Sequence, residues 1–121
     1  MLVEFPNVKQ EGGNHRRRWF QDGAMELIVW YEADDAPVGF QICYRGTDAA
    51  EHALTWRAGS GFTHARVDAG DARPDKNLTP ILVADGAVPW DLVTEEFRQR
   101  SADLAPGLRM AVLEQLRRGP A

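Results

Sequence analysis

The chain has 121 residues, of which 44% are hydrophobic and 26% charged, a composition typical of one globular domain and unlike that of a disordered protein. Its 18 acidic and 14 basic residues give a formal net charge of −4, so the field of the whole protein weakly repels nucleic acid and anionic membranes. No apolar run approaches the roughly 20 residues of a membrane-spanning helix, and we expect no membrane partner.

Cysteine content and the first residues of the chain predict a cytoplasmic protein. Cys43 is the single cysteine, so it cannot form an internal disulfide, which suits a reducing compartment. Glu4 and Pro6 stand where a signal peptide would need apolar residues. Only Lys9 and Lys76 among the basic residues are lysines, and this arginine bias, together with abundant alanine, indicates a GC-rich bacterial genome.

Residues 16–84 carry the alternation of apolar and polar side chains that is typical of strands. Between neighbouring apolar segments lie short turns, such as those at 34–37 and 46–48. These connections are too short for a parallel crossover, so neighbouring strands are expected to be antiparallel. A polar loop is expected over 70–80. The expected strands are 16–21, 24–33, 38–45, 51–58, 62–69 and 81–84.

The hydrophobic period becomes helical after residue 89. Pro106 fits the first turn of a second helix, and Gly119-Pro120 would end it. Strands followed by helices predict an α+β fold: an antiparallel β-meander of about five to six strands with two C-terminal helices packed on one face, in a single domain over 1–121. The expected core positions of the helices are Val93, Phe97, Leu104, Leu108, Val112 and Leu116.

Four segments give the chain a resemblance to a protein family. They are RRWF at 17–20, LIVWYE at 27–32, GFQICYR at 39–45 and ALTWR at 53–57. Together they resemble a family of small uncharacterised bacterial proteins, over most of residues 16–84. The resemblance implies a bacterial origin, and it implies neither an activity nor any functional residue.

The segment Arg16–Phe20, RRRWF, raises the question of nucleic-acid binding, because basic residues interleaved with aromatic ones line nucleic-acid grooves. In a strand, however, Arg16 and Arg18 point to one face, whereas Arg17 and Trp19 point to the other. The three arginines then form no continuous basic stripe. We expect an edge strand whose charges oppose edge-to-edge association, with a nucleic-acid partner as the less favoured alternative.

A second candidate site lies at the loop end of the strand expected at 62–69. His64, Arg66 and Asp68 alternate onto one face of this strand, and Asp71 follows in the loop. A histidine near carboxylates is typical of a general base or a metal ligand. His64 and Asp68 are about 13 Å apart along a straight strand, too far to share a metal without a bulge or a third ligand. The alternative is a set of ordinary exposed strand residues.

Two other residues with reactive side chains are expected to be structural. His52 shares strand parity with Leu54 and Trp56, which predicts a buried or half-buried core histidine. Cys43 has no neighbouring cysteine and no helix N-terminus to lower its pKa, so we expect an unreactive buried thiol. No motif in the sequence indicates a metal or a cofactor.

The face of the predicted sheet that the helices leave uncovered is the remaining candidate. If the helices cover the apolar face of 38–45, then Trp30, two glutamates and Arg57 are expected on the opposite, semi-apolar face. Such a surface is typical of a protein partner, a second subunit or a ligand groove. The alternative is that residues 70–80 or the N-terminal segment fold over it.

These observations favour a protein that is not an enzyme. We predict a binding or assembly domain that self-associates through its sheet as a homodimer, or that binds another protein. The first alternative is a small enzyme or ligand-binding protein that uses His64, Asp68 and Asp71. The second is a weak nucleic-acid binder that uses Arg16–Phe20.

Overall fold

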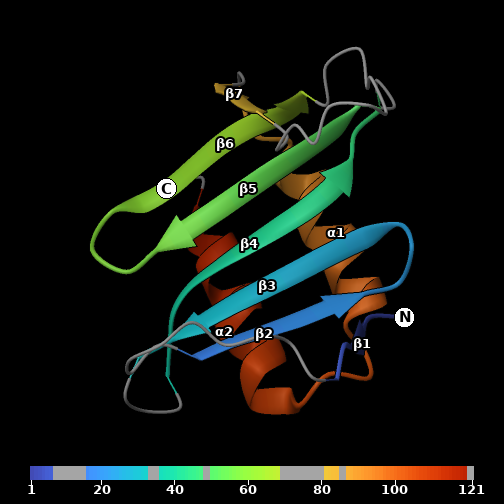
Figure 1. The fold of residues 1–121 in the computed structure, drawn as a ribbon, viewed down its shortest axis with the longest axis vertical. Helices are drawn as coiled ribbons and strands as arrows, with labels where there is room; N and C mark the ends of the chain where they lie inside the picture. Colours follow the sequence, from blue (N-terminus) through green and yellow to red (C-terminus); the bar gives the residue numbers. More distant parts are fainter. Residues whose placement is uncertain (7–15, 33–35, 48–49, 69–80, 85–86, 120–121) are drawn as a thin grey trace, which may run out of the picture.

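A computed structural model describes the chain in six stretches. Seven strands in these stretches form one antiparallel sheet, in which each strand pairs only with its neighbours in sequence (Figure 1). The strands are β1 (Val3–Glu4), β2 (Arg16–Gln21), β3 (Met25–Tyr31), β4 (Pro37–Arg45), β5 (Glu51–Arg57), β6 (Gly61–Asp68) and β7 (Ile81–Ala84). The described residues are 1–6, 16–32, 36–47, 50–68, 81–84 and 87–119.

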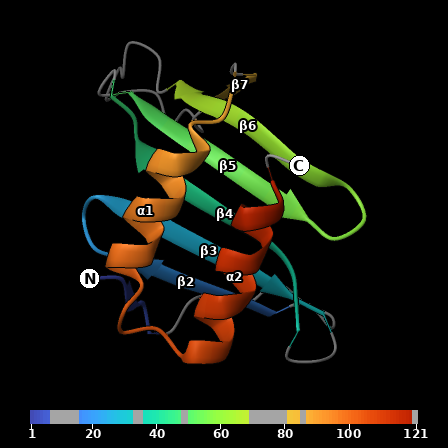
Figure 2. The same ribbon diagram turned by 180° about the vertical axis from the view of Figure 1, so that it is seen from behind.

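Two helices, α1 (Trp90–Arg100) and α2 (Pro106–Arg118), lie side by side across one face of this sheet (Figure 2). Strands come first and helices last, so the α+β fold expected from the periodicity is confirmed. All six expected helix-layer core positions are buried, and Pro106 is the first residue of α2. No helix in the described part of the chain has the length and apolarity needed to cross a membrane.

The core lies between the helices and the apolar face of the three central strands. Alternation along β3 buries every second residue, from Met25 to Tyr31, and the ladder aligns Leu27 with Ile42 of β4. Ile42 is in turn paired with Leu54 of β5. Successive side chains of a strand point to opposite faces of the sheet. This register therefore places one continuous apolar surface against the helices and a second surface on the opposite side of the sheet.

The meander has one strand that the sequence pattern did not indicate. β1 is two residues long and pairs with the end of β2, with Val3 opposite Gln21 and Glu4 opposite Phe20. The backbone N–H of Phe5 also donates to the carbonyl of Trp19, at 2.8 Å. The expectation that 16–21 is an edge strand is therefore wrong at this end, because β1 occupies that edge.

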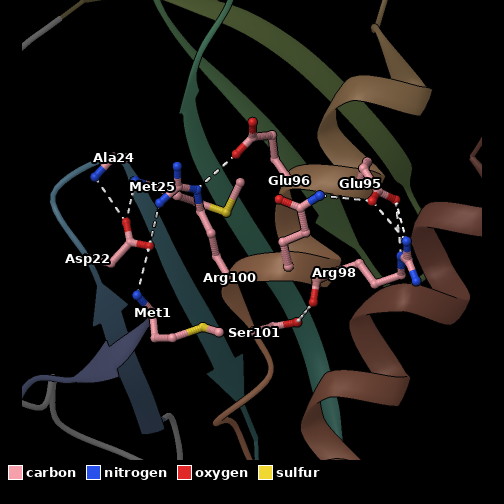
Figure 3. Close-up of polar contacts among 10 residues, drawn as sticks. Met1, Asp22, Ala24, Met25, Glu95, Glu96, Arg98, Arg100 and Ser101 are labelled. Atoms are coloured by element: carbon pink, nitrogen blue, oxygen red, sulfur yellow. Dashed lines mark hydrogen bonds and ion pairs between the residues drawn. The ribbon is translucent and has the colours of Figure 1, made fainter.

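Asp22, in the turn between β2 and β3, fastens the sheet to the helix layer (Figure 3). One carboxylate oxygen accepts hydrogen bonds from the backbone N–H groups of Ala24 and Met25. The other oxygen is 2.8 Å from the Arg100 guanidinium and 3.6 Å from the terminal ammonium of Met1. Only 3% of the Asp22 side chain is exposed, so the end of α1 is joined to the sheet by a buried carboxylate.

Burial and hydrogen bonding act on the pKa of Asp22 in opposite directions. Burial alone raises it, because a low-dielectric environment penalises the charged form. The hydrogen bonds from Arg100, Ala24 and Met25 favour the charged form and outweigh burial, so the pKa falls from 3.8 to about 2.

Candidate functional site

The three arginines of the RRRWF segment lie on two faces of the sheet, as the strand parity predicts. The register places Arg16 opposite Tyr31 and Arg18 opposite Val29, both on the face that the helices cover. The Arg16 guanidinium lies 4.6 Å from the centre of the Tyr31 ring. Arg18 donates two hydrogen bonds to the carboxylate of Glu4, at 2.7 and 2.9 Å.

Arg17 and Trp19 belong to the opposite face of β2, where Arg17 is paired with Trp30 and Trp19 with Ile28. The segment therefore presents no stripe of three adjacent cations to a phosphate backbone. This distribution weakens the nucleic-acid hypothesis.

His64 occupies a different environment from the one expected. It lies on the helix-covered face of β6 and is half-buried, so the expectation of an ordinary exposed residue is wrong for His64. Arg66, two residues later, is exposed as expected. The side chain of Asp68 and the whole of Asp71 lie outside the described residues, so their predicted grouping with His64 is untested.

His64 forms a cluster with one tyrosine and one histidine from the two preceding strands. The Tyr44 hydroxyl and Nε2 of His64 share a hydrogen bond of 2.6 Å. The His52 ring stacks on both neighbours, 5.4 Å from Tyr44 and 5.5 Å from His64 between ring centres. His52 is 8% exposed, which confirms it as a core histidine.

Register across three strands creates this cluster. The β4–β5 hairpin sets Tyr44 opposite His52, and the β5–β6 hairpin sets Leu54 opposite His64, one diagonal position away from His52. Alternation along a single strand does not identify Tyr44 as a site residue, because the cluster depends on the register between strands. The usable signal was the pair of short turns, since turn length fixes which residues face one another across a hairpin.

Two cavities are lined by His64. The smaller, about 310 Å³, is also lined by Tyr44, His52, Pro89 and Leu92. The larger, about 570 Å³, lies among β5, β6 and the ends of the helices, and its walls include Trp56, Phe62, Trp90, Gln115 and Arg118. The walls of the smaller cavity are mainly apolar, and those of the larger are polar and apolar in nearly equal parts. Both volumes fall in the range of about 300 to 1,000 Å³ that is typical of small-molecule sites.

The surface of the sheet opposite the helices faces the viewer in Figure 1, and no described helix lies over it. We call this surface the open face. Residues 7–15 and 70–80 lie outside the described residues, so the alternative that they fold over this surface is untested. Trp30, Gly39 and Arg57 are directly aligned on it across β3, β4 and β5. The Arg57 guanidinium lies 4.7 Å from the centre of a Trp30 ring, so the predicted sharing of one face by these two residues is confirmed.

Gly39 makes the position of Trp30 possible. A Cβ atom built at Gly39 would lie 3.2 Å from the Trp30 ring and 2.9 Å from the backbone oxygen of Trp56. A larger residue would therefore push the indole away from the sheet. The glycine lets Trp30 lie low over β4, with the Arg57 guanidinium against it.

Apolar side chains of the open face continue to the β1 edge. Trp19 and Ile28 are half-buried and aligned across β2 and β3. Phe5 packs edge-to-face on Trp19, with ring centres 6.0 Å apart, and is 39% exposed. Val3 is 65% exposed. The open face thus carries a band of apolar groups from β1 to β3, next to the Trp30–Arg57 pair.

At the other end of the strands, the open face carries two carboxylates and one guanidinium, because Arg45 is paired with Glu51 across β4 and β5 and lines the same cavity. The ligand atoms of Glu26, Cys43 and Glu51 lie within 4.8 Å of one another and line a cavity of about 180 Å³. Burial, and secondly the charge of Glu51, raise the pKa of Glu26. These carboxylates repel each other, and the guanidinium of Arg45 on the same cavity wall offsets part of their charge.

Cys43 itself is a poor metal ligand in this setting. Burial raises the pKa of its thiol to about 11, more than the hydrogen bond from the Gln41 amide lowers it. A thiol must lose its proton to bind a metal or to react. The expectation that the Cys43 thiol is buried is confirmed, and the raised pKa agrees with the expected low reactivity.

Comparison of the chain with protein-family models, curated proteins and solved structures finds no match. The family resemblance of residues 16–84 is therefore without support, and it contributes nothing to the function of this chain.

Proposed function

We propose that the protein is a non-enzymatic assembly domain that pairs with a second copy of itself through the open face of its sheet. The observation that carries this proposal is the apolar band of Phe5, Trp19, Ile28 and Trp30, which runs across the open face and ends beside Arg17 and Arg57. Aromatic residues and arginine are the side chains most enriched at the centres of protein interfaces.

The charges of the open face are arranged to be self-complementary. Arg57 and Glu51 lie at opposite ends of β5, and Arg17 and Glu26 lie at opposite ends of the adjacent strands β2 and β3. Two copies can meet through their open faces about a two-fold axis that is parallel to the sheet and perpendicular to its strands. This axis places each strand end of one copy over the opposite strand end of the other copy. Arg57 of one copy then faces Glu51 of its partner.

The same pairing relieves the repulsion between Glu26 and Glu51. In the monomer these carboxylates are close together, which contributes to the raised pKa of Glu26. A guanidinium from the second copy would compensate their charge, and ion pairs of this kind fix the orientation of an interface more than they increase its affinity. The buried thiol of Cys43 and the lack of a second cysteine suit assembly in the cytoplasm.

Sedimentation velocity over a wide concentration range tests the proposal. Wild-type protein is expected to show a concentration-dependent increase in mass. Trp30→Glu is expected to weaken this self-association by at least about tenfold, since it places a charge in the apolar band of the open face. Met110→Glu is the matched control, because Met110 is an exposed apolar residue of the helix layer. Circular dichroism verifies that both variants fold.

Charge exchange tests the orientation of the two copies. Arg57→Glu and Glu51→Arg are each expected to weaken the dimer, and the double variant is expected to recover much of the loss because the facing pair is restored with reversed sign. A wild-type protein that stays monomeric at every concentration, or a Trp30→Glu variant that associates like wild type, would falsify the proposal.

A ligand-binding role for the His64 region is the second candidate, favoured by the 2.6 Å hydrogen bond that positions His64 between two cavities. Nucleic-acid binding is not favoured, because the arginines of Arg16–Phe20 are divided between the two faces of the sheet. Thermal-shift measurements against small molecules distinguish the second candidate, since assembly alone gives no ligand-dependent stabilisation.

A further inference from the structure

We infer that the 570 Å³ cavity beside His64 binds a small planar aromatic molecule that carries a carboxylate or a similar anionic group. The cavity lies on the helix side of the sheet, whereas the proposed dimer uses the open face. The inference gives a ligand class to the second candidate function and is independent of self-association.

The aromatic walls of this cavity are held in place by the core. Trp56 stacks on the buried Phe40 ring with centres 5.5 Å apart, and Phe62 meets Phe40 edge-on at 6.1 Å. Trp90, the first residue of α1, packs edge-to-face on Phe62 at 5.0 Å. Three aromatic side chains from two strands and one helix therefore form a preorganised apolar surface that suits a flat ring.

Arg118 supplies the charge at this cavity. It lies in the last turn of α2, and its guanidinium donates to Glu114 at 3.1 Å. Arg117 pairs with the same carboxylate at 2.7 Å but is not among the residues that line the cavity. Two guanidinium groups share one carboxylate, so this corner keeps a net positive charge and attracts an anion rather than a cation.

His64 adds a fixed polar group to the wall. Its hydrogen bond to the Tyr44 hydroxyl and its stacking on His52 restrict the orientation of the imidazole. A side chain held by such contacts keeps its polar edge in one position, which is what a binding site needs to orient a ligand. The cavity thus combines aromatic walls, one oriented imidazole and a cation from a third element.

The naphthalene series tests this combination with three probes of nearly equal shape: 2-naphthoate, 2-naphthamide and 2-naphthylmethylamine. Each is titrated into the full chain, followed by backbone amide shifts in NMR spectra. We expect saturable binding with the largest shifts at residues around the cavity, and an affinity order of carboxylate, then amide, then amine. Shifts that map to the open face, or an amine that binds as well as the carboxylate, would overturn the inference.

Two neighbouring arginines supply a matched pair of variants. Arg118→Gln is expected to weaken 2-naphthoate binding by about three- to fivefold, the effect of losing one partly exposed ion pair, and to leave 2-naphthamide binding unchanged. Arg117→Gln is expected to change neither. Equal effects of the two variants would contradict a role for Arg118 within the cavity.

Phe62→Leu tests the aromatic wall, and is expected to weaken all three probes while circular dichroism shows a native fold. Repeating the titration with Trp30→Glu separates the two proposals. The probes are expected to bind this variant as they bind wild type, whatever its state of association. If no probe binds either wild type or Trp30→Glu, the cavity is rejected as a binding site. The proposed assembly is unaffected by that result.

Discussion

Asp22 shows how one residue can control the pH range of the fold. Its pKa is lowered to about 2, whereas an unfolded aspartate titrates near 3.8. A carboxyl group with a lowered pKa in the folded state stabilises that state above its unfolded pKa, and the contribution disappears as the pH falls through the folded value. The stabilisation is therefore complete above about pH 4 and is lost towards pH 2.

Asp22→Asn is expected to lower the free energy of unfolding by about 2 kcal/mol at pH 7 and by much less at pH 2, because at pH 2 the carboxyl is protonated in the unfolded state and about half protonated in the folded state. Urea titrations at the two pH values measure the difference. Glu95→Gln is the control, since Glu95 forms an exposed ion pair on α1 and should change stability by less than about 0.5 kcal/mol. An equal loss for Asp22→Asn at both pH values would contradict this account.

Gly107 in α2 and Gly119 at the end of this helix are expected to respond in opposite ways to substitution by alanine. A Cβ atom at Gly119 would clash with the Trp90 ring, whereas a Cβ atom at Gly107 would meet no atom within 4 Å. Gly119→Ala is expected to destabilise the protein by roughly 1–3 kcal/mol through overpacking. Gly107→Ala is expected to be neutral or to stabilise by up to about 1 kcal/mol. Thermal unfolding of both variants provides the measurement, and equal midpoints would be the contradictory result.

At the scale of elements, β1 is held mainly by one side chain. Leu2 precedes the strand, is buried in the core, and its backbone N–H donates to the carbonyl of Arg100. Val3, its neighbour, is exposed. Leu2→Ala is therefore expected to lower the free energy of unfolding by about 2 kcal/mol, and Val3→Ala by less than about 0.5 kcal/mol. Denaturant titration compares them, and similar losses would mean that the two-residue ladder holds β1.

Sequence periodicity was sufficient for the longer elements and insufficient for β1. The odd residues of β3 and the six helix positions repeat often enough to reveal their buried side. Two residues cannot display a period of two, and Leu2 makes its contacts with an element almost one hundred residues later. The core position of Leu2 therefore has no local signal.

The candidate sites also divide into features that strand alternation predicts and features that depend on tertiary packing. The parity rule separated Arg17 from Arg16 and Arg18, and grouped Trp30 with Arg57, because both conclusions need only the alternation of a strand. His64 depends on which strands flank β6 and on where the helices end. Those relations come from tertiary packing, so sequence reasoning found the residue but not its exposure or its partner Tyr44.

On the scale of the whole molecule, the two layers separate two roles. The helix layer encloses the core and, at its margin, the aromatic cavity. The helices lie on one side of the sheet only (Figures 1 and 2). The other side carries the apolar band and the charged residues beside it. Because the sheet lies between them, substitutions on one side are expected to leave the function of the other side intact.

The order of the elements also bears on how the chain folds while it is being synthesised. Each strand pairs with the strand made just before it, so the meander can form progressively as the chain leaves the ribosome. The helices that cover Phe40, Ile42 and Leu54 come last, and α2 ends about 60 residues after β5. At about 5–20 residues per second, the nascent sheet keeps an uncovered apolar face for several seconds. A chaperone that protects nascent chains would bind this apolar face during that interval.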